Sequence, residues 1–225
     1  MLTVHHLQVS QSDRVVFLCE ELGIPYELKI HKRDPVLSPQ SIKDLHPIGA
    51  APIIQDGDLT LAETAAIVEY IINIYGNGRL TIKPGQKEYA DYLYWFHYAN
   101  GSLMPGLMRM LALKSVKGDP ESDMFKFYAG RADNLTRQID NRLKDNKYLA
   151  GDEFTAADIM TIFPFTTGRY FVSSDLSAYP NILAWVKRVT ERPAYQKYHQ
   201  KADPELQIPV DGPPPPHFST LLNKA

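Results

Sequence analysis

Two serines, Ser10 and Ser12, occupy a loop in which a hydroxyl could stabilise a negative charge. They follow a short run at residues 2–7 that predicts a strand, and they precede a helical pattern that Arg14 enters. A hydroxyl can donate a hydrogen bond to an anion such as a thiolate, and a helix N-terminus adds a positive dipole end. Ser12 could instead be the N-cap of that helix, so the choice between the two serines stays open.

A second candidate site surrounds a short hairpin. Residues 53–61 predict two strands joined by an Asp-Gly turn, and the apolar spacing over residues 65–75 predicts a helix. Pro52 opens the first strand, where an interior proline would normally prevent pairing. A cis bond before Pro52 would expose the backbone N–H and C=O of Ala51, which could then pair with an extended peptide as one more strand.

Glu63 and Thr64 stand where the second strand of this hairpin becomes a helix. The free N–H groups and the positive dipole end of a helix start attract a carboxylate. Together with the backbone of Ala51, this arrangement predicts a site for a small peptide that carries a carboxylate. The alternative is an ordinary strand–turn–helix with Glu63 as an exposed acid of the first turn.

The composition excludes several other classes of protein. The 225 residues carry 24 basic and 26 acidic side chains, so no basic field indicates nucleic-acid binding. The single cysteine, Cys19, excludes an internal disulfide framework and fits a reducing compartment. The opening residues lack a signal-peptide pattern, and no apolar run reaches the ~18 residues of a membrane span. We therefore expect a cytoplasmic protein.

The chain divides into three stretches of different character. The strand–helix–strand order at the start predicts a parallel unit within a domain at residues 1–78. Residues 87–203 predict an all-helical domain, whose first long helix runs from Tyr89 through Leu113. Residues 204–225 contain four successive prolines and predict an extended tail over the surface.

Two motifs resemble those of the glutathione transferase family. The first is G-x-x-P-I-I at residues 49–54, followed by L-A-E-T-A-A-I at residues 61–67. The second is L-A-G-x-x-F-T-x-A-D-I at residues 149–159, in which Thr155 and Asp158 predict a helix-capping box. The chain looks most like the serine-type fungal and bacterial members. The resemblance implies an α/β thioredoxin-like N-terminal domain plus an all-α C-terminal domain.

The resemblance also implies roles for residues of the first domain. Ser10, four residues before Arg14, would stabilise the thiolate of glutathione, with Ser12 as its competitor and Gln11 as a further backbone donor. Lowering a thiol pKa of ~8.5 by two units requires about 2.7 kcal/mol of preferential thiolate stabilisation. The other implied contacts to glutathione are Ala51, Pro52, Glu63 and Thr64. The family often has a basic residue before Pro39 for the glycyl carboxylate; this chain has none there, and Lys43 or His46 would substitute.

The second substrate is expected between the domains, against the first helix of the helical domain. Aromatic and soft apolar side chains are dense there, and such side chains line adaptable hydrophobic pockets. The candidates for this pocket are His97, Ser102, Met104 and Met108. A helix packed in the core or at a dimer interface would explain the same stripe.

Three further side chains could react but fit packing roles better. His5 and His6 are adjacent on a predicted strand, so one should face inward and the other outward. Cys19 lies on the apolar face of the first predicted helix and should be buried and inert. Disulfide exchange by a protein thiol is therefore disfavoured.

The preferred hypothesis is a glutathione transferase that adds the glutathione thiolate to a small hydrophobic electrophile. Glutathione would be a co-substrate, and no metal or prosthetic group is implied. The resemblance suggests a homodimer. The alternatives are a glutathione-dependent peroxidase, a lyase acting on glutathionyl substrates, or a binding module that kept the fold without the chemistry.

Overall fold

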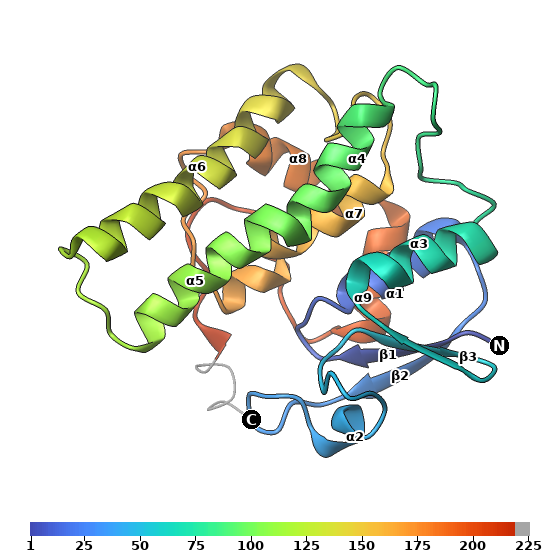
Figure 1. Cartoon of the computed structure of the whole chain (residues 1–225). Coiled ribbons are helices and arrows are strands. Elements are labelled where there is room, and N and C mark those ends of the chain that lie inside the picture. The colour runs from blue at the N-terminus through green and yellow to red at the C-terminus, as the bar shows by residue number, and fades with distance from the viewer. Residues whose placement is uncertain (219–225) are drawn as a thin grey trace. The chain divides into compact units, whose positions relative to one another are not determined.

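The computed structural model describes residues 1–218, which form two compact units (Figure 1). The first unit comprises residues 1–81 and 188–208, and the second comprises residues 82–187 and 209–218. The chain thus leaves the first unit, returns to it and leaves it again. Across the part of the chain that is described, no helix is both long enough and apolar enough to cross a membrane.

A four-stranded sheet forms the centre of the first unit. Its strands are β1 (Thr3–Leu7), β2 (Glu27–His31), β3 (Ile53–Asp56) and β4 (Leu59–Ala62), in the order β2-β1-β3-β4. The pairing of β1 with β2 is parallel, and the other two pairings are antiparallel. The predicted parallel unit and the predicted hairpin are both confirmed.

Helices cover both faces of this sheet. Figure 1 shows α1 (Asp13–Leu22), α3 (Thr64–Ile74) and α9 (Pro193–Ala202) on one face and α2 (Gln40–Lys43) on the other. Gly23 ends α1 with a φ of 64°, a left-handed value that glycine adopts without steric cost. An edge-to-face contact of Phe17 with Tyr195, with ring centroids 5.1 Å apart, packs α9 against α1.

The predicted first helix of the second unit is present, and a π-helical turn interrupts its regular α-helical pattern. It consists of α4 (Tyr89–Tyr98), a π-helical turn (Ala99–Leu103) and α5 (Met104–Ser115). Pro105 supplies the reason, because proline has no N–H to donate to the carbonyl four residues earlier. The N–H of Met104 bonds instead to the carbonyl of Ala99, five residues earlier.

The remaining helices enclose the core of the second unit. They are α6 (Asp123–Asp145), α7 (Ala156–Ile162), two 3₁₀ turns (Phe163–Phe165 and Thr167–Tyr170) and α8 (Pro180–Thr190). Helices α5 and α6 run side by side (Figure 1) and approach closely at Gly106. A Cβ added there would lie 2.5 Å from a methyl carbon of Leu135.

The predicted capping box starts α7. The Thr155 hydroxyl accepts from the N–H of Ala157, and Asp158 accepts from the N–H of Thr155. The same buried carboxylate also accepts from the N–H of Leu149 at 3.1 Å and from the indole N–H of Trp185 at 2.9 Å. Burial raises the pKa of Asp158 to about 6, against the effect of these donors, which lowers it.

The buried Arg169 binds the backbone of residues 209–213, which follow the last part of the first unit. The guanidinium of Arg169 donates to the backbone carbonyls of Ser174, Pro209, Asp211, Gly212 and Pro213. Residues 207–217 contain no helix or strand, as expected of the proline-rich tail. Its last part, residues 219–225, lies outside the described residues.

Candidate functional site

The strand register brings three candidate segments to one edge of the sheet. His5 of β1 pairs with Ile53, the first residue of β3, and Ile53 also pairs with Ala62, the last residue of β4. The loop that leaves β1, the residues that enter β3 and the residues that leave β4 therefore lie at the same edge. These are residues 8–12, 51–52 and 63–64, which together span more than 50 positions of the sequence.

The bond between Ala51 and Pro52 is cis, as predicted. Pro52 is buried and Ala51 is half-buried. Helix α2 supports this segment, because its Ile42 packs with Ile53 and Ala62 in one small core cluster. Lys43 follows Ile42 and is exposed in the last turn of α2, so its ammonium group lies on the solvent side of the helix.

Helix α3 begins where the sequence predicts it. Glu63 is its N-cap residue and has a φ of 72°, a left-handed value that is uncommon outside glycine. The Glu63 side chain is exposed, whereas Thr64 is buried. The first N–H groups of an α-helix have no intrahelical partner, so this end of α3 is suited to receive a carboxylate.

Ser10 and Ser12 are in direct contact. Their Oγ atoms are 2.7 Å apart, and the Ser12 N–H donates to the Ser10 Oγ at 3.2 Å. Ser10 keeps 8% of its surface exposed, while Ser12 keeps none. Ser12 is at the N-cap position of α1, but its hydroxyl accepts from the N–H of Leu7 at 3.0 Å and caps no helical N–H. Both serines are buried, and Ser10 is the one that keeps a small exposed fraction.

The loop carrying these serines is fixed by charged side chains. Arg33, which follows β2, donates to the carbonyls of Gln8 and Val9 at 2.9 Å and 2.8 Å. Val9 has a φ of 52°, a strained value for a β-branched residue, so these contacts hold the loop in a conformation it would not adopt alone. The Gln11 side chain accepts from Arg14 at 2.8 Å, and burial lowers the pKa of Arg14 to about 10.

The prediction that one strand histidine faces outward is wrong. His5 and His6 do point to opposite faces, but helices cover both faces and both side chains are buried. His5 lies 3.0 Å from ring nitrogen Nε2 of His31 and 3.0 Å from the amide oxygen of Gln55. Burial lowers the pKa of both His5 and His31. His6 instead contacts Ser12 and Asp203.

The sequence did not indicate Asp203. It is the C-cap of α9, and it lies 197 positions from its partner His6. Its carboxylate also accepts from the N–H of Val9 at 3.2 Å. Nothing in the local sequence around a C-terminal helix predicts such a partner. Cys19, in contrast, is buried as predicted, and burial raises the pKa of its thiol.

The four residues predicted for the second substrate lie along the interrupted helix of the second unit. His97 and Met108 are exposed, Ser102 is half-buried in the π-helical turn, and Met104 is buried at the start of α5. Whether they contact a substrate stays a prediction.

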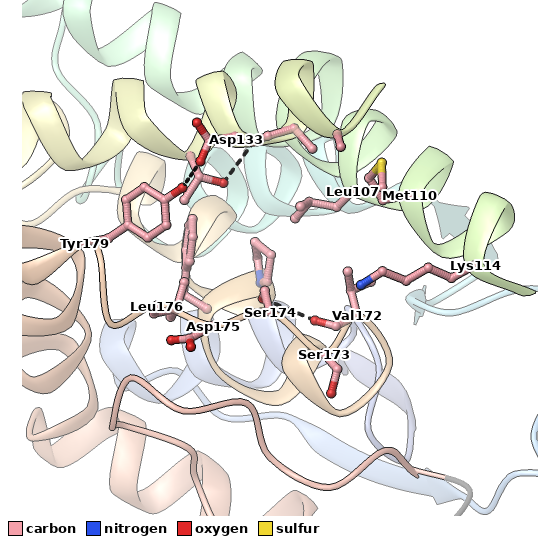
Figure 2. Close-up of a pocket in the computed structure, with 15 residues that line it drawn as sticks. Leu107, Met110, Lys114, Asp133, Val172, Ser173, Ser174, Asp175, Leu176 and Tyr179 are labelled. Carbon is pink, nitrogen blue, oxygen red and sulfur yellow. Dashed lines mark hydrogen bonds between the residues drawn. The ribbon is translucent and has the colours of Figure 1, made fainter. Parts of the chain in front are cut away.

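A pocket of about 270 Å³ lies within the second unit (Figure 2). It is bounded by α5, α6 and the segment after the 3₁₀ turns, and it uses Leu107 and Met110 of α5 rather than Met104 or Met108. Figure 2 shows Lys114 at one end and the hydrogen-bonded pair Asp133 and Tyr179 at the other. An apolar wall with a cation at one end and a carboxylate at the other suits a small amphipathic molecule.

Comparison with protein families identifies both halves of the chain. Residues 4–79 match the family described as the glutathione S-transferase N-terminal domain, and residues 119–193 match the glutathione S-transferase C-terminal domain. A curated relative, glutathione S-transferase 3 of Schizosaccharomyces pombe, is 34% identical over 90% of this chain and 88% of its own length.

Solved structures agree with this assignment. A glutathione S-transferase of Actinobacillus pleuropneumoniae is 32% identical, covers 90% of this chain and 93% of its own, and has a TM-score of 0.82. A glutathione transferase of Phanerochaete chrysosporium, solved in complex with oxidized glutathione, is 21% identical. It covers 89% of this chain and 95% of its own with a TM-score of 0.70, and it supports the fold alone.

Proposed function

Since this chain belongs to the glutathione S-transferase family of enzymes, we propose that it conjugates the thiolate of glutathione to small hydrophobic electrophiles. The observation that carries the proposal is the shared sheet edge. It brings together Ser10, which keeps a small exposed fraction, the half-buried Ala51 at the cis Ala51–Pro52 bond and the start of α3 at Glu63. Glutathione is a tripeptide with a thiol and a carboxylate at each end. Its thiol would meet Ser10, its backbone would meet Ala51, and one carboxylate would meet the start of α3.

Ser10 takes the role of thiolate donor in this proposal. It retains exposed surface, whereas the Ser12 hydroxyl is enclosed by Leu7, His6 and Ser10 itself. A hydrogen bond to a charged acceptor is about twice as strong as a neutral one, so Ser10 would stabilise the thiolate more than the thiol. Gln11 would add a backbone donor beside it.

The remaining contacts follow from the peptide character of glutathione. The backbone of Ala51 would pair with the cysteinyl residue, in the manner of an added strand. Glu63 and Thr64 would receive the γ-glutamyl end at the start of α3. The exposed Lys43 would pair with the glycyl carboxylate.

The electrophile is assigned to the second unit. His97, Ser102, Met104 and Met108 remain the proposed contacts, since they present adaptable side chains along one helix. A homodimer and a cytoplasmic location are proposed from the family alone.

A titration with two variants tests the proposal. Glutathione binding would be measured by calorimetry, and conjugation by turnover of chlorodinitrobenzene. We expect Ser10→Ala to keep glutathione binding and to lose about a hundredfold in kcat/KM, as when one transition-state donor is removed. Ser115→Ala, an exposed serine of the second unit, is the control and should behave as the wild type.

The outcomes separate the alternatives. If the wild type does not bind glutathione, the protein is a binding module with this fold and the proposal fails. If it binds glutathione but reduces peroxides and conjugates nothing, the peroxidase alternative replaces the transferase.

A further inference from the structure

A continuous chain of hydrogen bonds runs inward from Ser10. The Ser10 Oγ lies 2.7 Å from the Ser12 Oγ, which lies 2.9 Å from Nδ1 of His6. The other nitrogen of that ring, Nε2, lies 3.1 Å from a carboxylate oxygen of Asp203. Ser10 is the only one of the four residues that keeps more than 3% of its surface exposed. The chain therefore joins its one partly exposed residue to an almost fully enclosed histidine–carboxylate pair.

The partners decide which nitrogen of His6 carries hydrogen. A carboxylate can only accept, and Asp203 already accepts from the Val9 N–H. Nε2 of His6 must therefore donate to Asp203, and Nδ1 of the neutral ring accepts from the Ser12 hydroxyl. Ser12 accepts in turn from the Ser10 hydroxyl and from the N–H of Leu7, and its own hydrogen has the Leu7 carbonyl at 3.3 Å as a second, longer acceptor. In this arrangement every hydrogen of the chain points inward.

The same heavy atoms support the opposite arrangement. If Nδ1 of His6 is protonated, it donates to Ser12, the Ser12 hydroxyl donates to Ser10, and the Ser10 hydroxyl points outward. Ser10 then accepts from the Ser12 hydroxyl and from the Ser12 N–H. Every group of the chain keeps a partner except the Ser10 hydrogen, which is free to donate to a bound ligand, so the chain can reverse without any movement of the backbone.

From this reversibility we infer that His6, supported by Asp203, receives the thiol proton of bound glutathione through Ser10 and Ser12. The thiol gives its proton to the Ser10 Oγ, Ser10 gives its own to the Ser12 Oγ, and Ser12 gives its own to Nδ1 of His6. One S–H bond breaks and one N–H bond forms, with no oxidation or reduction. The product is a thiolate that accepts from the outward Ser10 hydroxyl, and an imidazolium paired with the Asp203 carboxylate.

Asp203 is a positioning residue in this scheme. It fixes the ring of His6 with Nε2 as donor, and it balances the positive charge that the ring acquires, as a buried aspartate does in serine hydrolases. Further charged and titratable groups interact with this pair, among them Arg33, Tyr198 and His31. After the thiolate has reacted, the stored proton leaves through the same hydroxyls, and the inward arrangement returns.

His5 provides a matched control on the same strand. Like His6, it is buried. Its hydrogen-bonded chain runs to Gln55, His31 and Ser41 and does not include Ser10. A substitution of His5 changes a buried histidine of β1 while leaving the proposed relay intact.

The decisive measurement is a proton count. Thiolate formation would be followed by its ultraviolet absorbance on glutathione binding at neutral pH. Proton release would be obtained by calorimetry in two buffers that differ in ionisation enthalpy. S-methylglutathione, which has no thiol proton, gives the release due to all other groups, and the difference belongs to the thiol.

In the wild type we expect thiolate to form with far less than one proton released per thiolate, because the proton stays on His6. In His6→Gln the thiolate fraction should fall about tenfold, which corresponds to one pKa unit, and any thiolate that remains should release one full proton. Asp203→Asn should give an intermediate result. His5→Gln should match the wild type.

The inference rests on the proposed function but fails separately from it. One proton released per thiolate in the wild type, or an unchanged count in His6→Gln, overturns the relay and leaves the transferase intact. Absence of glutathione binding in the wild type overturns the proposed function instead. Binding of S-methylglutathione to each variant shows that the variant is folded.

Discussion

Two buried aspartates, Asp203 in the first unit and Asp158 in the second, have opposite kinds of partner. Asp158 accepts from backbone N–H groups, a threonine hydroxyl and an indole, and its amide and indole donors keep their hydrogens. Asp203 accepts from one backbone N–H and from a histidine that can gain a proton. Burial is nearly the same, since both carboxylates are almost fully enclosed. The hydrogen-bond partners, and not the degree of burial, decide whether a buried carboxylate only stabilises the fold or can also take part in a reaction.

The largest expected effect is the loss of stability in Asp158→Ala. The donors of Leu149, Thr155 and Trp185 would be left buried without an acceptor, so unfolding free energy should fall by about 3–5 kcal/mol. Urea denaturation measures this loss. Asp152→Ala, an exposed acid of the same loop, should change stability by less than ~0.5 kcal/mol. Equal losses in the two variants would contradict the structural role of Asp158.

The pH dependence of stability should carry a signature of Asp158. The folded-state pKa of Asp158 is raised to about 6, above the ~3.9 of an unfolded chain. The folded state therefore takes up a proton as pH falls, and this stabilisation is complete below ~3.9 and lost as pH rises through about 6. Relative to Asp158→Ala, the wild type should gain up to ~3 kcal/mol between pH 7 and pH 4. Denaturation curves at several pH values measure the difference in unfolding free energy between the wild type and Asp158→Ala. A difference that does not change with pH would contradict the prediction.

Asp203→Asn should have a small effect on stability and a larger effect on the thiolate of bound glutathione. Its amide oxygen can still accept from Val9, so we expect a stability loss of only about 1–2 kcal/mol. The thiolate of bound glutathione should nevertheless decrease, because the imidazolium of His6 loses its counter-charge. Ultraviolet titration and urea denaturation of the same sample compare the two quantities. A variant that loses stability but keeps its thiolate would make Asp203 a folding residue like Asp158.

The smallest expected effect concerns the cap of α7. Thr155→Ala removes one capping hydroxyl but leaves Asp158 in place, so the loss should be about 1 kcal/mol. Glutathione binding should be unchanged. A loss as large as that of Asp158→Ala would mean that the threonine hydroxyl, and not the carboxylate, organises this end of the helix.

Local signals in the sequence predict much of the fold but only part of the candidate site. The cis bond at Pro52 and the capping box at Asp158 depend on neighbours within a few positions, so residue types and spacing are sufficient to predict them. The π-helical turn was missed although Pro105 marks it, because a single proline is equally compatible with a simple kink.

Asp203 could not be predicted from spacing at all. Its partners His6 and Val9 lie at the other end of the chain, and only the packing of α9 along α1 brings them together. The same holds for His6, which reads as a packed strand residue until its partners are known. Long-range pairs of buried polar groups are the part of a site that one sequence does not reveal.

The path of the chain between its two units has a consequence for the order in which they are completed. Because residues 188–208 complete the first unit and residues 209–218 complete the second, neither unit has all of its residues until these segments have been synthesised. Asp203 is among the last of the proposed relay to be synthesised. A translation product that ended before Asp203 would keep Ser10 and His6 but would lack the carboxylate that balances the charge of His6. In the proposed relay, such a product would not take up the thiol proton on His6.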